Sequence, residues 1–343
     1  MELCLYHPLG YYQSPRIKIG REGDFLTSPT ITPAFGKLIA SQLMEIWQVL
    51  GGSRLSVLEW GGGNGALADA VLKSSERNSE FYKGLQYDIV EKNQPSTHPS
   101  NKSIHWHQNV ADIPPFDGCV ISNELIDNFP VHQVVMQEKL MEVFVGYKKG
   151  FTEVLVPARH ELVAYFEEMN IELPMGHRAE VNLDARQWIQ LVSEKLHRGF
   201  VITIDYGTLA HELYHSKRSA GSLLCYYKHQ VHDNPYINIG NQDITAHVNF
   251  SALMRWGEQA GLCTTGYVTQ LNFLRALGLN QYLRDLEVTQ YPRQIADRNW
   301  MLQHFIFEMG NRIKVLVQHK GLHAPRLSGL FFANPVVMEE MFL

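Results

Sequence analysis

A glycine-rich turn between an apolar run and an amphipathic segment constrains the fold of this chain most strongly. Within residues 53–72, SRLSVLEWGGGNGALADAVL, the apolar run 55–58 ends at Glu59. Glycines follow at alternate positions, Gly61, Gly63 and Gly65. Apolar residues then recur at helical spacing, so the pattern predicts a buried strand, a tight turn and a helix. Glycine provides the positive φ angles and close backbone approach that such a turn needs.

The spacing of these glycines indicates the kind of ligand. The motif reads E-x-G-x-G-x-G, whereas dinucleotide-binding folds show G-x-G-x-x-G. A carboxylate at Glu59 would repel a pyrophosphate but would suit a cation, and S-adenosylmethionine carries a sulfonium and an ammonium. The motif therefore favours S-adenosylmethionine over NAD. A glycine-rich turn without a ligand is the alternative, because a single glycine motif is weak evidence.

Composition excludes several classes of protein. The 343 residues are 45% hydrophobic, as in an ordinary soluble protein, and carry a formal net charge of −5. This charge argues against a general nucleic-acid binder, which needs a basic surface. No apolar run approaches the roughly 20 residues of a membrane span, and the N-terminus does not resemble a signal peptide.

The residues that commonly bind metals form no metal motif. The four cysteines are scattered singly, and the sixteen histidines include no HExxH arrangement. His105 and His107 flank Trp106 in an expected strand, so they share a face and are assigned a surface or structural role. We expect no metal site, and the isolated cysteines indicate a reducing compartment.

Strands and helices are expected to alternate along much of the chain. A helix is predicted over 32–50, with Thr32 as its cap and Pro33 in its first position. Further strands are expected at 85–90, 103–107, 118–122, 199–205, 261–269 and 329–333. Further helices are expected at 161–169, 183–197, 250–260, 271–286 and 298–317.

Three other stretches lack this alternation. Residues 1–30 are rich in Gly, Pro and Tyr and are predicted to be loops and turns. Residues 131–157 contain alternating segments separated by turns, which predicts an antiparallel insertion. Residues 208–250 are predicted to be irregular.

The alternation of strands and helices predicts an α/β fold with a mostly parallel sheet covered by helices on both faces. In such sheets ligands bind beyond the carboxyl ends of the strands. Polar residues fall at or just past five expected strand ends: Glu59, Glu91, Asp112, Asn123-Glu124 and Asp205. We therefore expect the functional site at this edge of the sheet.

Several motifs resemble one family. They are LYHPLGYY at 5–12, GDFLTSP at 23–29, the glycine loop, NELIDNFPVH at 123–132, DYG at 205–207 and DITAHVNF at 243–250. In this order they resemble the MidA family of class I S-adenosylmethionine-dependent methyltransferases. GDFxTSP and NELxDxxPV are the most specific of them. The mitochondrial members of that family act as protein-arginine methyltransferases in the assembly of respiratory complex I.

The resemblance implies a Rossmann-like methyltransferase domain at 53–343, preceded by an N-terminal loop and helical cap at 1–52. The insertion would lie at about 131–157, and a substrate-side elaboration with additional helical segments at about 208–330. Family members usually have more chain before LYHP, so the N-terminus looks trimmed. Asn249 stands where Asp is frequent in the family.

The resemblance also implies roles in cofactor binding. Gly61, Gly63 and Gly65, after Glu59, would line the methionine part of S-adenosylmethionine. Glu91 would hold the ribose hydroxyls and Asp112 would meet the adenine edge. A loop closing over the cofactor would include the three residues Asp24, Thr27 and Ser28.

Asn123, Glu124 and Asp127 lie where class I enzymes place substrate groups. Carboxylates can orient a planar guanidinium by charge-assisted hydrogen bonds. Glu124 and Asp127 are expected one helical turn apart on one face, and helix capping by Asn123 and Glu124 is the alternative. His247 and Tyr206 could border the acceptor pocket or be structural.

We therefore expect a methyltransferase that acts on an arginine of a protein substrate, such as a complex I subunit or a similar assembly client. The alternative is a cofactor-binding assembly factor that mainly holds a partner. The expected location is the bacterial cytoplasm, or the mitochondrial matrix if the chain is a trimmed eukaryotic form. The oligomeric state stays open, and a homodimer is one option.

Overall fold

Two units divide the chain. The computed structural model describes residues 1–14, 24, 27–93, 103–287 and 292–333. Unit 1 comprises Met1–Phe25, Ile126–Ile189 and Tyr206–Trp256. Unit 2 comprises Leu26–Leu125, Gln190–Asp205 and Gly257–Leu343. The expected division into domains at residues 52 and 53 stays a prediction.

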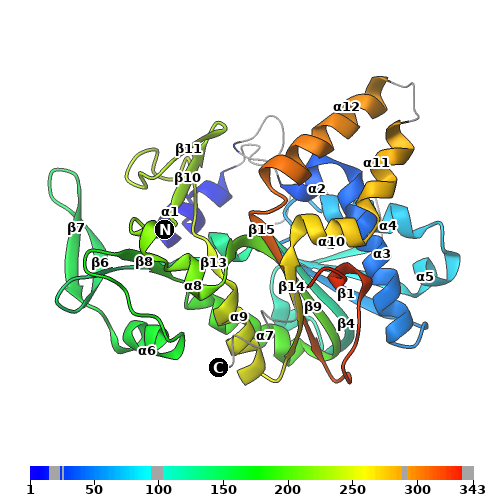
Figure 1. The fold of residues 1–343 in the computed structure, drawn as a ribbon, viewed down its shortest axis with the longest axis horizontal. Helices are drawn as coiled ribbons and strands as arrows, with labels where there is room; N and C mark the ends of the chain where they lie inside the picture. Colours follow the sequence, from blue (N-terminus) through cyan, green and yellow to red (C-terminus); the bar gives the residue numbers. More distant parts are fainter. Residues whose placement is uncertain (15–23, 25–26, 94–102, 288–291, 334–343) are drawn as a thin grey trace. The chain divides into compact units, whose positions relative to one another are not determined.

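A sheet with the strand order β14-β15-β9-β4-β1-β2-β3 forms the centre of unit 2 (Figure 1). In that order the strands are β14 (Cys263–Thr269), β15 (Ile313–Lys320), β9 (Leu196–Thr208), β4 (Phe116–Asn123), β1 (Leu55–Trp60), β2 (Leu85–Val90) and β3 (Ile104–His107). The strands from β9 to β3 pair in parallel, and β14 pairs antiparallel with β15. The mostly parallel sheet is thus confirmed.

The apolar sequence of β1 explains its central place. Leu55, Val57 and Leu58 are at most 1% exposed, as expected for a strand covered on both faces. Because β1 pairs with β2 on one side and β4 on the other, its carboxyl end lies between two neighbouring strand ends. This arrangement brings the residues after β1, β2 and β4 together.

Helix α3 (Pro33–Val49) begins as predicted. The Thr32 side chain accepts a hydrogen bond from the Ala34 N–H at 3.2 Å, and Pro33 occupies the first helical position. The helix packs closely on α4 (Ala66–Ser75) at Gly36, where the missing side chain permits the approach. A Cβ at this position would lie only 2.4 Å from the Cβ of Ala70. The remaining helices of unit 2 are α2 (Ser28–Ile31), α5 (Ser79–Gly84), η2 (Val110–Asp112), α10 (Gln270–Ala276), α11 (Leu279–Glu287), α12 (Pro292–Met301), η5 (Leu302–Glu308) and η6 (Ser328–Leu330).

Unit 1 contains two antiparallel sheets. The predicted insertion forms three strands of a sheet of order β7-β6-β5-β8, and β8 lies outside it. The antiparallel pairing of β5 with β6 and of β6 with β7 confirms the predicted antiparallel segments. The strands of this sheet are β5 (His132–Met136), β6 (Leu140–Tyr147), β7 (Phe151–Pro157) and β8 (Arg178–Val181). The second sheet has the order β11-β10-β12, with β10 (Leu224–Tyr227), β11 (Gln230–His232) and β12 (Asp243–Thr245).

The other elements of unit 1 are mostly short. They are α1 (Glu2–Tyr6), η1 (Tyr11–Gln13), η3 (Ile126–Asn128), α6 (His160–Glu168), α8 (Ala210–Leu213), η4 (Ser216–Arg218), β13 (Val248–Asn249) and α9 (Phe250–Gln259). Strand β13 pairs in parallel with the end of β9 through Val248 and Gly207. Helix α7 (Asp184–Lys195) crosses the boundary between the two units.

Several sequence-based assignments were wrong. Residues 1–30 contain α1, η1 and α2 rather than only loops, and 208–250 contain three short strands of one sheet. The helix expected at 298–317 ends with η5 at Glu308, and residues 313–317 belong to β15. The strand expected at 329–333 is instead the 3₁₀ turn η6.

Two further helix boundaries differ from the prediction. The helix expected at 271–286 is divided into α10 and α11, and the helix expected at 183–197 ends at Lys195, where β9 follows. Within the described residues, no helix combines the length and apolarity needed to cross a lipid bilayer.

Candidate active site

The glycine loop has the strand-turn-helix geometry that the sequence predicts. Gly61, Gly63 and Gly65 have φ angles of 78°, 55° and 75°, in the left-handed region that glycine adopts readily. The Gly61 N–H donates to the Val90 carbonyl at 2.8 Å, which ties the loop to the end of β2. Gly65 is the N-cap of α4. The loop is therefore fixed between β1 and α4.

Glu91 follows β2 beside this loop. Its Oε2 accepts from the Gly63 N–H at 3.0 Å, and its Oε1 accepts from the Asn93 N–H at 3.1 Å. Its own N–H donates to the His107 carbonyl at 3.0 Å. Burial raises the pKa of the Glu91 carboxyl, while these backbone donors lower it. The carboxylate is thus oriented at the strand end where a ribose-binding group was predicted.

Glu59 is buried at the end of β1, with 3% of its surface exposed. Its Oε2 accepts from the Tyr87 hydroxyl at 2.9 Å. Burial raises the pKa of Glu59 to about 8. A carboxyl with this pKa is mostly protonated at pH 7, so the full charge assumed in the sequence argument is not its resting state. A nearby cation would favour the charged form.

Asp112 ends the short turn η2 that follows β3, and its side chain is exposed. Asn109 caps this turn by accepting from the Ala111 N–H at 2.9 Å. Val110 is buried beneath it. Asp112 therefore lies at the strand end where the sequence placed it, with its carboxylate accessible.

Glu124 follows β4 in a strained conformation, with a φ angle of 50°. Its Oε1 accepts from the Ser28 N–H at 3.0 Å and from Asn123 Nδ2 at 3.1 Å. Burial, with a smaller contribution from the charge of Asp205, raises the pKa of Glu124 to about 8. A non-glycine residue with positive φ marks a position that the surrounding structure holds in place, often at a functional site.

Asn123 leaves a buried acceptor unused at the end of β4. Its Oδ1 is buried and has no hydrogen-bond partner among the described residues. Buried polar atoms normally have partners, so this atom fits a ligand that donates a hydrogen bond. Together with the carboxyls of Glu59 and Glu91, it suits a cofactor bearing an ammonium, a sulfonium and ribose hydroxyls.

Two local structures contain the residues that were predicted to form a loop closing over the cofactor, Asp24, Thr27 and Ser28. Thr27 caps α2, and the two side chains of Thr27 and Thr30 form a capping box. Ser28 is fully buried and donates from Oγ to Gln270 Oε1 at 3.0 Å. Asp24, in unit 1, accepts from the Tyr11 hydroxyl at 2.7 Å and from the Lys228 N–H at 2.7 Å. Ser28 thus supports Glu124, whereas Asp24 supports unit 1.

Asp127 lies in the 3₁₀ turn η3 of unit 1 and is 5% exposed. The prediction that Glu124 and Asp127 share one helical face was wrong. Glu124 precedes η3, and its positive φ breaks the helical geometry. The two carboxylates are thus held by separate local structures.

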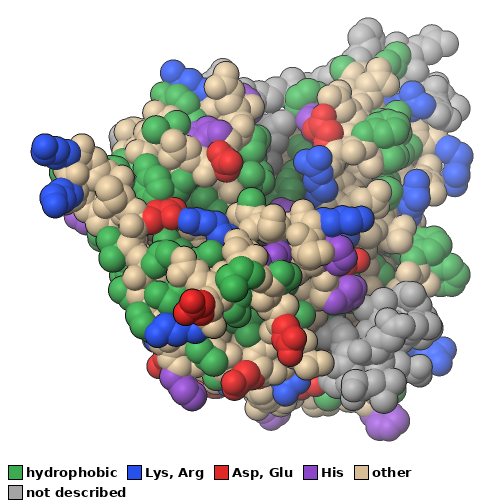
Figure 2. All heavy atoms as spheres, turned by 60° about the vertical axis from the view of Figure 1, so that its left-hand side comes forward, with side chains coloured by type: hydrophobic (Ala, Val, Ile, Leu, Met, Phe, Trp, Pro, Cys, Tyr) green, Lys and Arg blue, Asp and Glu red, His purple; other side chains and the backbone are tan. Residues whose placement is uncertain are grey.

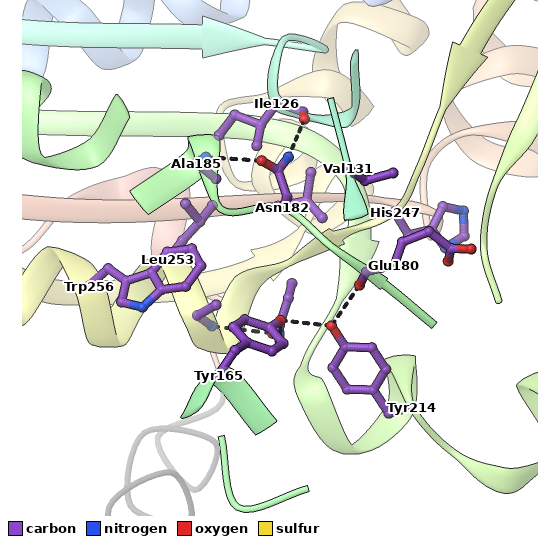
Figure 3. A pocket seen from close by; sticks show the side chains of 13 residues that line it. Ile126, Val131, Tyr165, Glu180, Asn182, Ala185, Tyr214, His247, Leu253 and Trp256 are labelled. Atoms are coloured by element: carbon purple, nitrogen blue, oxygen red, sulfur yellow. Dashed lines mark hydrogen bonds between the residues drawn. The ribbon is translucent and has the colours of Figure 1, made fainter. Parts of the chain in front are cut away.

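Sequence reasoning missed the residues that hold η3. Asn182 Nδ2 donates to the Ile126 carbonyl at 2.9 Å, and its Oδ1 accepts from the Ala185 N–H at 2.9 Å (Figure 3). The hydroxyls of Tyr6 and Tyr12 also reach Asn128. These tyrosines belong to the motif LYHPLGYY, which carried the family resemblance, but no local pattern assigns them a partner.

The pocket of Figure 3 lies in unit 1 and encloses about 10 Å³. This is the space of at most one water molecule, so it cannot accept an arginine side chain. Asn249 lines it, donating to the Tyr165 hydroxyl at 2.7 Å and accepting from the Ala252 N–H at 3.2 Å. Asn249 therefore caps α9 and has a structural role, and His247 borders the same pocket.

His105 and His107 both approach Asp88 on β2. His107 Nε2 lies 2.8 Å and His105 Nδ1 lies 3.7 Å from Asp88 Oδ1. This arrangement agrees with the structural role assigned to the histidines. In the parts of the chain that the structure describes, no group of three or more His, Cys, Asp or Glu side chains is placed to hold a metal ion.

Comparisons with known proteins agree with this geometry. The family model of S-adenosyl-L-methionine-dependent methyltransferases matches residues 38–268, which include the glycine loop and the polar strand ends described above. The chain belongs to this methyltransferase family. Its cofactor is therefore S-adenosylmethionine, and the MidA resemblance is confirmed.

Relatives of this methyltransferase cover most of its length. The chain is 27% identical to the mitochondrial "Protein arginine methyltransferase NDUFAF7 homolog" of Drosophila melanogaster over 95% of this chain and 82% of that protein. It is 25% identical to the mitochondrial human protein arginine methyltransferase NDUFAF7 over 83% and 70% of the two chains.

A solved structure shares the whole fold. The crystal structure of a Burkholderia thailandensis protein bound to S-adenosyl-homocysteine matches with a TM-score of 0.87 and 28% sequence identity. The match covers 98% of this methyltransferase and 90% of that chain. The α/β methyltransferase fold is thus confirmed.

Proposed function

We propose that this methyltransferase transfers a methyl group to an arginine side chain of a protein partner. The observation that carries the proposal is the Glu124 carboxyl at the end of β4, which accepts from the Ser28 N–H. Asp127, which accepts from Asn128 within unit 1, is a second candidate for binding the acceptor. A guanidinium is planar and cationic, and carboxylates are its preferred hydrogen-bond partners. The relatives named protein arginine methyltransferases support this choice of acceptor.

The cofactor supplies an electrophilic methyl group on a sulfonium. In our proposal Gly61, Gly63 and Gly65 admit its methionine part close to the backbone. Glu91, already oriented by Gly63, holds the ribose hydroxyls. Asp112 meets the adenine edge.

The positive charge of the cofactor would be met by Glu59 and Asn123. Asn123 has an unused buried acceptor, and Glu59 becomes charged when a cation approaches. In the proposed loop the side chains of Asp24, Thr27 and Ser28 act indirectly, by fixing the segments that carry them.

Methyl transfer to arginine needs alignment more than covalent help from the protein. The S–CH₃ bond breaks as the N–CH₃ bond forms, and the nitrogen loses a proton to solvent or to a carboxylate. We assign the orientation of the guanidinium to a carboxylate, either Glu124 in unit 2 or Asp127 in unit 1, because transfer needs the nitrogen in line with the S–CH₃ bond. The raised pKa of Glu124 implies that entry of the guanidinium displaces a proton from this carboxyl.

The hairpin of β6 and β7 suits recognition of a protein. Its exposed large apolar side chains are Phe144, Val145, Tyr147, Phe151, Val154 and Leu155. Hydrophobic side chains are visible between charged ones on the face that comes forward in Figure 2. Exposed apolar surface of this kind often marks a protein interface. We propose that this hairpin, with the stretch 208–250, binds the partner.

The MidA resemblance makes a respiratory complex I subunit, or a similar assembly client, the candidate partner. We also propose that the reaction takes place in the bacterial cytoplasm, or in the mitochondrial matrix if the chain is a trimmed eukaryotic form. Mass spectrometry of arginine methylation, in cells with and without the gene, identifies the partner. Identical methylation in both would contradict the proposal and favour a factor that only holds its client.

Comparison of three acceptors then tests the recognition surface. We expect methylation of the intact partner but not of free arginine or a short peptide around the modified site, because remote binding energy would be missing. Comparable kcat/KM values on all three acceptors would remove a recognition role from the hairpin and from 208–250.

A further inference from the structure

The main chain of η3 is held at three consecutive carbonyl groups. The Ile126 carbonyl accepts from Asn182 Nδ2 at 2.9 Å, and the Asp127 carbonyl accepts from the Ala246 N–H at 2.9 Å. The Asn128 carbonyl accepts from the Tyr6 hydroxyl at 3.0 Å. The three donors come from separate stretches of unit 1, namely the residue after β8, the residue after β12 and helix α1. The turn is thus held by three stretches that are distant from it in sequence.

A second set of contacts reaches the Asp127 side chain. The Tyr12 hydroxyl donates to Asn128 Oδ1 at 2.6 Å, and Asn128 Nδ2 donates to Asp127 Oδ1 at 2.8 Å. The order of donors fixes the Asn128 amide, because its oxygen faces the hydroxyl and its nitrogen faces the carboxylate. Tyr12 therefore determines which end of the amide meets Asp127.

We propose that Tyr12 and Asn128 are positioning residues that hold the Asp127 carboxylate in the orientation needed to bind the arginine guanidinium. This inference rests on the proposed role of Asp127 in acceptor binding. It assigns a catalytic purpose to the tyrosines of LYHPLGYY, which precede the methyltransferase sheet in the sequence. Tyr12 and Asn128 act only through Asp127 and need not touch the substrate.

The surroundings of Tyr12 are consistent with a directed hydrogen-bond chain. Its hydroxyl also lies 3.0 Å from Asp243 Oδ1, and burial raises the pKa of Asp243 to about 7. The single hydroxyl proton of Tyr12 faces two acceptors, Asp243 Oδ1 at 3.0 Å and Asn128 Oδ1 at 2.6 Å, and the shorter distance favours Asn128. The other titratable groups acting on Tyr12 are Tyr6, Tyr11 and Asp127, and Asp24 acts on Asp243.

Tyr6 provides a matched control. Its ring stacks on that of Tyr12, with centroids 5.5 Å apart and planes at 19°. Its hydroxyl donates to the carbonyl of Asn128, whereas that of Tyr12 donates to the side chain. The substitutions Tyr6→Phe and Tyr12→Phe thus remove the same atom from two stacked rings, and only Tyr12→Phe interrupts the path to the Asp127 carboxylate.

A double-mutant cycle tests the proposal. Wild type, Tyr12→Phe, Asp127→Asn and the double variant are assayed with tritiated S-adenosylmethionine, using an extract of cells lacking the gene as acceptor. Radioactive methylarginine is measured after acid hydrolysis. Calorimetry with S-adenosylhomocysteine counts folded binding sites, so that each rate refers to folded enzyme. Tyr6→Phe is assayed alongside.

We expect Tyr12→Phe to lower the rate per binding site about tenfold, as the loss of a buried hydrogen bond would, with cofactor affinity unchanged. Tyr6→Phe should lower it less than about threefold. In the Asp127→Asn background, Tyr12→Phe should have no further effect, since residues acting through one another are not additive.

The other outcomes overturn the proposal in distinct ways. A full tenfold effect of Tyr12→Phe in both backgrounds would show that Tyr12 does not act through Asp127, while the function of Asp127 would stand. If Tyr12→Phe by itself leaves the rate unchanged, Tyr12 does not position Asp127, and the function of Asp127 again stands. Unchanged methylation by Asp127→Asn would remove the acceptor role of Asp127 and the positioning role together.

Discussion

The cofactor edge of unit 2 and the acceptor turn of unit 1 are built in different ways. At the cofactor edge, polar groups follow neighbouring parallel strands and are held by nearby backbone, as Gly63 holds Glu91 across 28 positions. The acceptor turn η3 is held by groups remote in sequence, including Tyr12 and Tyr6, which lie 116 and 122 positions from Asn128. In our proposal, cofactor binding therefore depends on contacts between neighbouring strand ends, whereas acceptor positioning depends on contacts between residues more than 100 positions apart. Substitutions in the two regions should have separable effects.

The largest effect is expected at the glycine loop. Gly63→Val should abolish the rise in melting temperature that S-adenosylhomocysteine causes, because a β-branched residue fits poorly at φ 55° and its strain would displace the N–H that orients Glu91. Thermal unfolding with and without ligand measures this.

The matched control is Gly52→Val. Gly52 also has a positive φ, 69°, and a Cβ there would lie 3.9 Å from its nearest neighbour, Trp47. This variant should lose stability but keep the ligand-induced shift. Loss of the shift in both variants would mean that general destabilisation, not the loop, explains the result.

The next effect concerns the acceptor turn. Asp127→Asn should reduce methyl transfer to the partner about 10- to 100-fold, because a charge-assisted hydrogen bond contributes about 1.5–3 kcal/mol. Affinity for S-adenosylhomocysteine should not change. A radiolabel assay alongside calorimetry separates the two, and loss of cofactor binding together with transfer would contradict the proposed separation.

The buried carboxyls should make both units less stable as pH rises. The pKa values of Glu59 and Asp243 are raised to about 8 and about 7, so folding retains a proton on each that the unfolded chain releases. Their stabilising contribution is complete below the unfolded pKa values, about 4, and is lost as pH rises through 7 and 8. The slope is about 1.4 kcal/mol per pH unit for each group in its window.

Denaturant unfolding between pH 5 and 9 checks this expectation. Glu59→Gln should flatten the decline up to about pH 8, and Asp243→Asn should flatten it up to about pH 7. An unchanged slope in Glu59→Gln would show that this carboxyl is not protonated in the folded protein.

The smallest effect on the fold is expected at the β6–β7 hairpin. Tyr147 is 75% exposed, so Tyr147→Ser should change the free energy of unfolding by less than about 0.5 kcal/mol. It should raise KM for the intact partner several-fold without changing kcat on that partner. Phe331→Ser, at an 80% exposed aromatic residue of unit 2, is the control and should leave KM unchanged. Equal changes in both variants would argue against recognition by the hairpin.

Patterns of residues close in sequence were sufficient to predict the strands, the helix cap and the glycine turn at the cofactor edge. The predicted strand 85–90 coincides with β2, and Thr32 caps α3 as expected. The left-handed glycines lie where the motif placed them. These features could be predicted because alternation, capping and glycine spacing act between residues close in sequence.

The errors fall where a distant partner decides the structure. Residues 313–317 were assigned to a helix, yet they belong to β15 because β14 supplies hydrogen bonds along the strand. The N-terminal residues were assigned to loops, although Leu5 and Tyr11 pack in a core with Cys225 and Ile244. No window of sequence around either segment contains its partner.

The sequence by itself determined the chemistry of the site: a glycine loop, carboxyls at strand ends, and an Asn-Glu pair followed by Asp127. Only the tertiary structure decided the backbone conformation, the pKa and the hydrogen-bond partners of these residues. In the tertiary structure Glu124 has a positive φ, and burial raises the pKa of Glu59 to about 8. Hydrogen bonds also connect the Tyr12 hydroxyl through the Asn128 amide to the Asp127 carboxylate. The physical reason is that burial and hydrogen-bond direction depend on which distant residues enclose a side chain, and a local pattern does not contain that information.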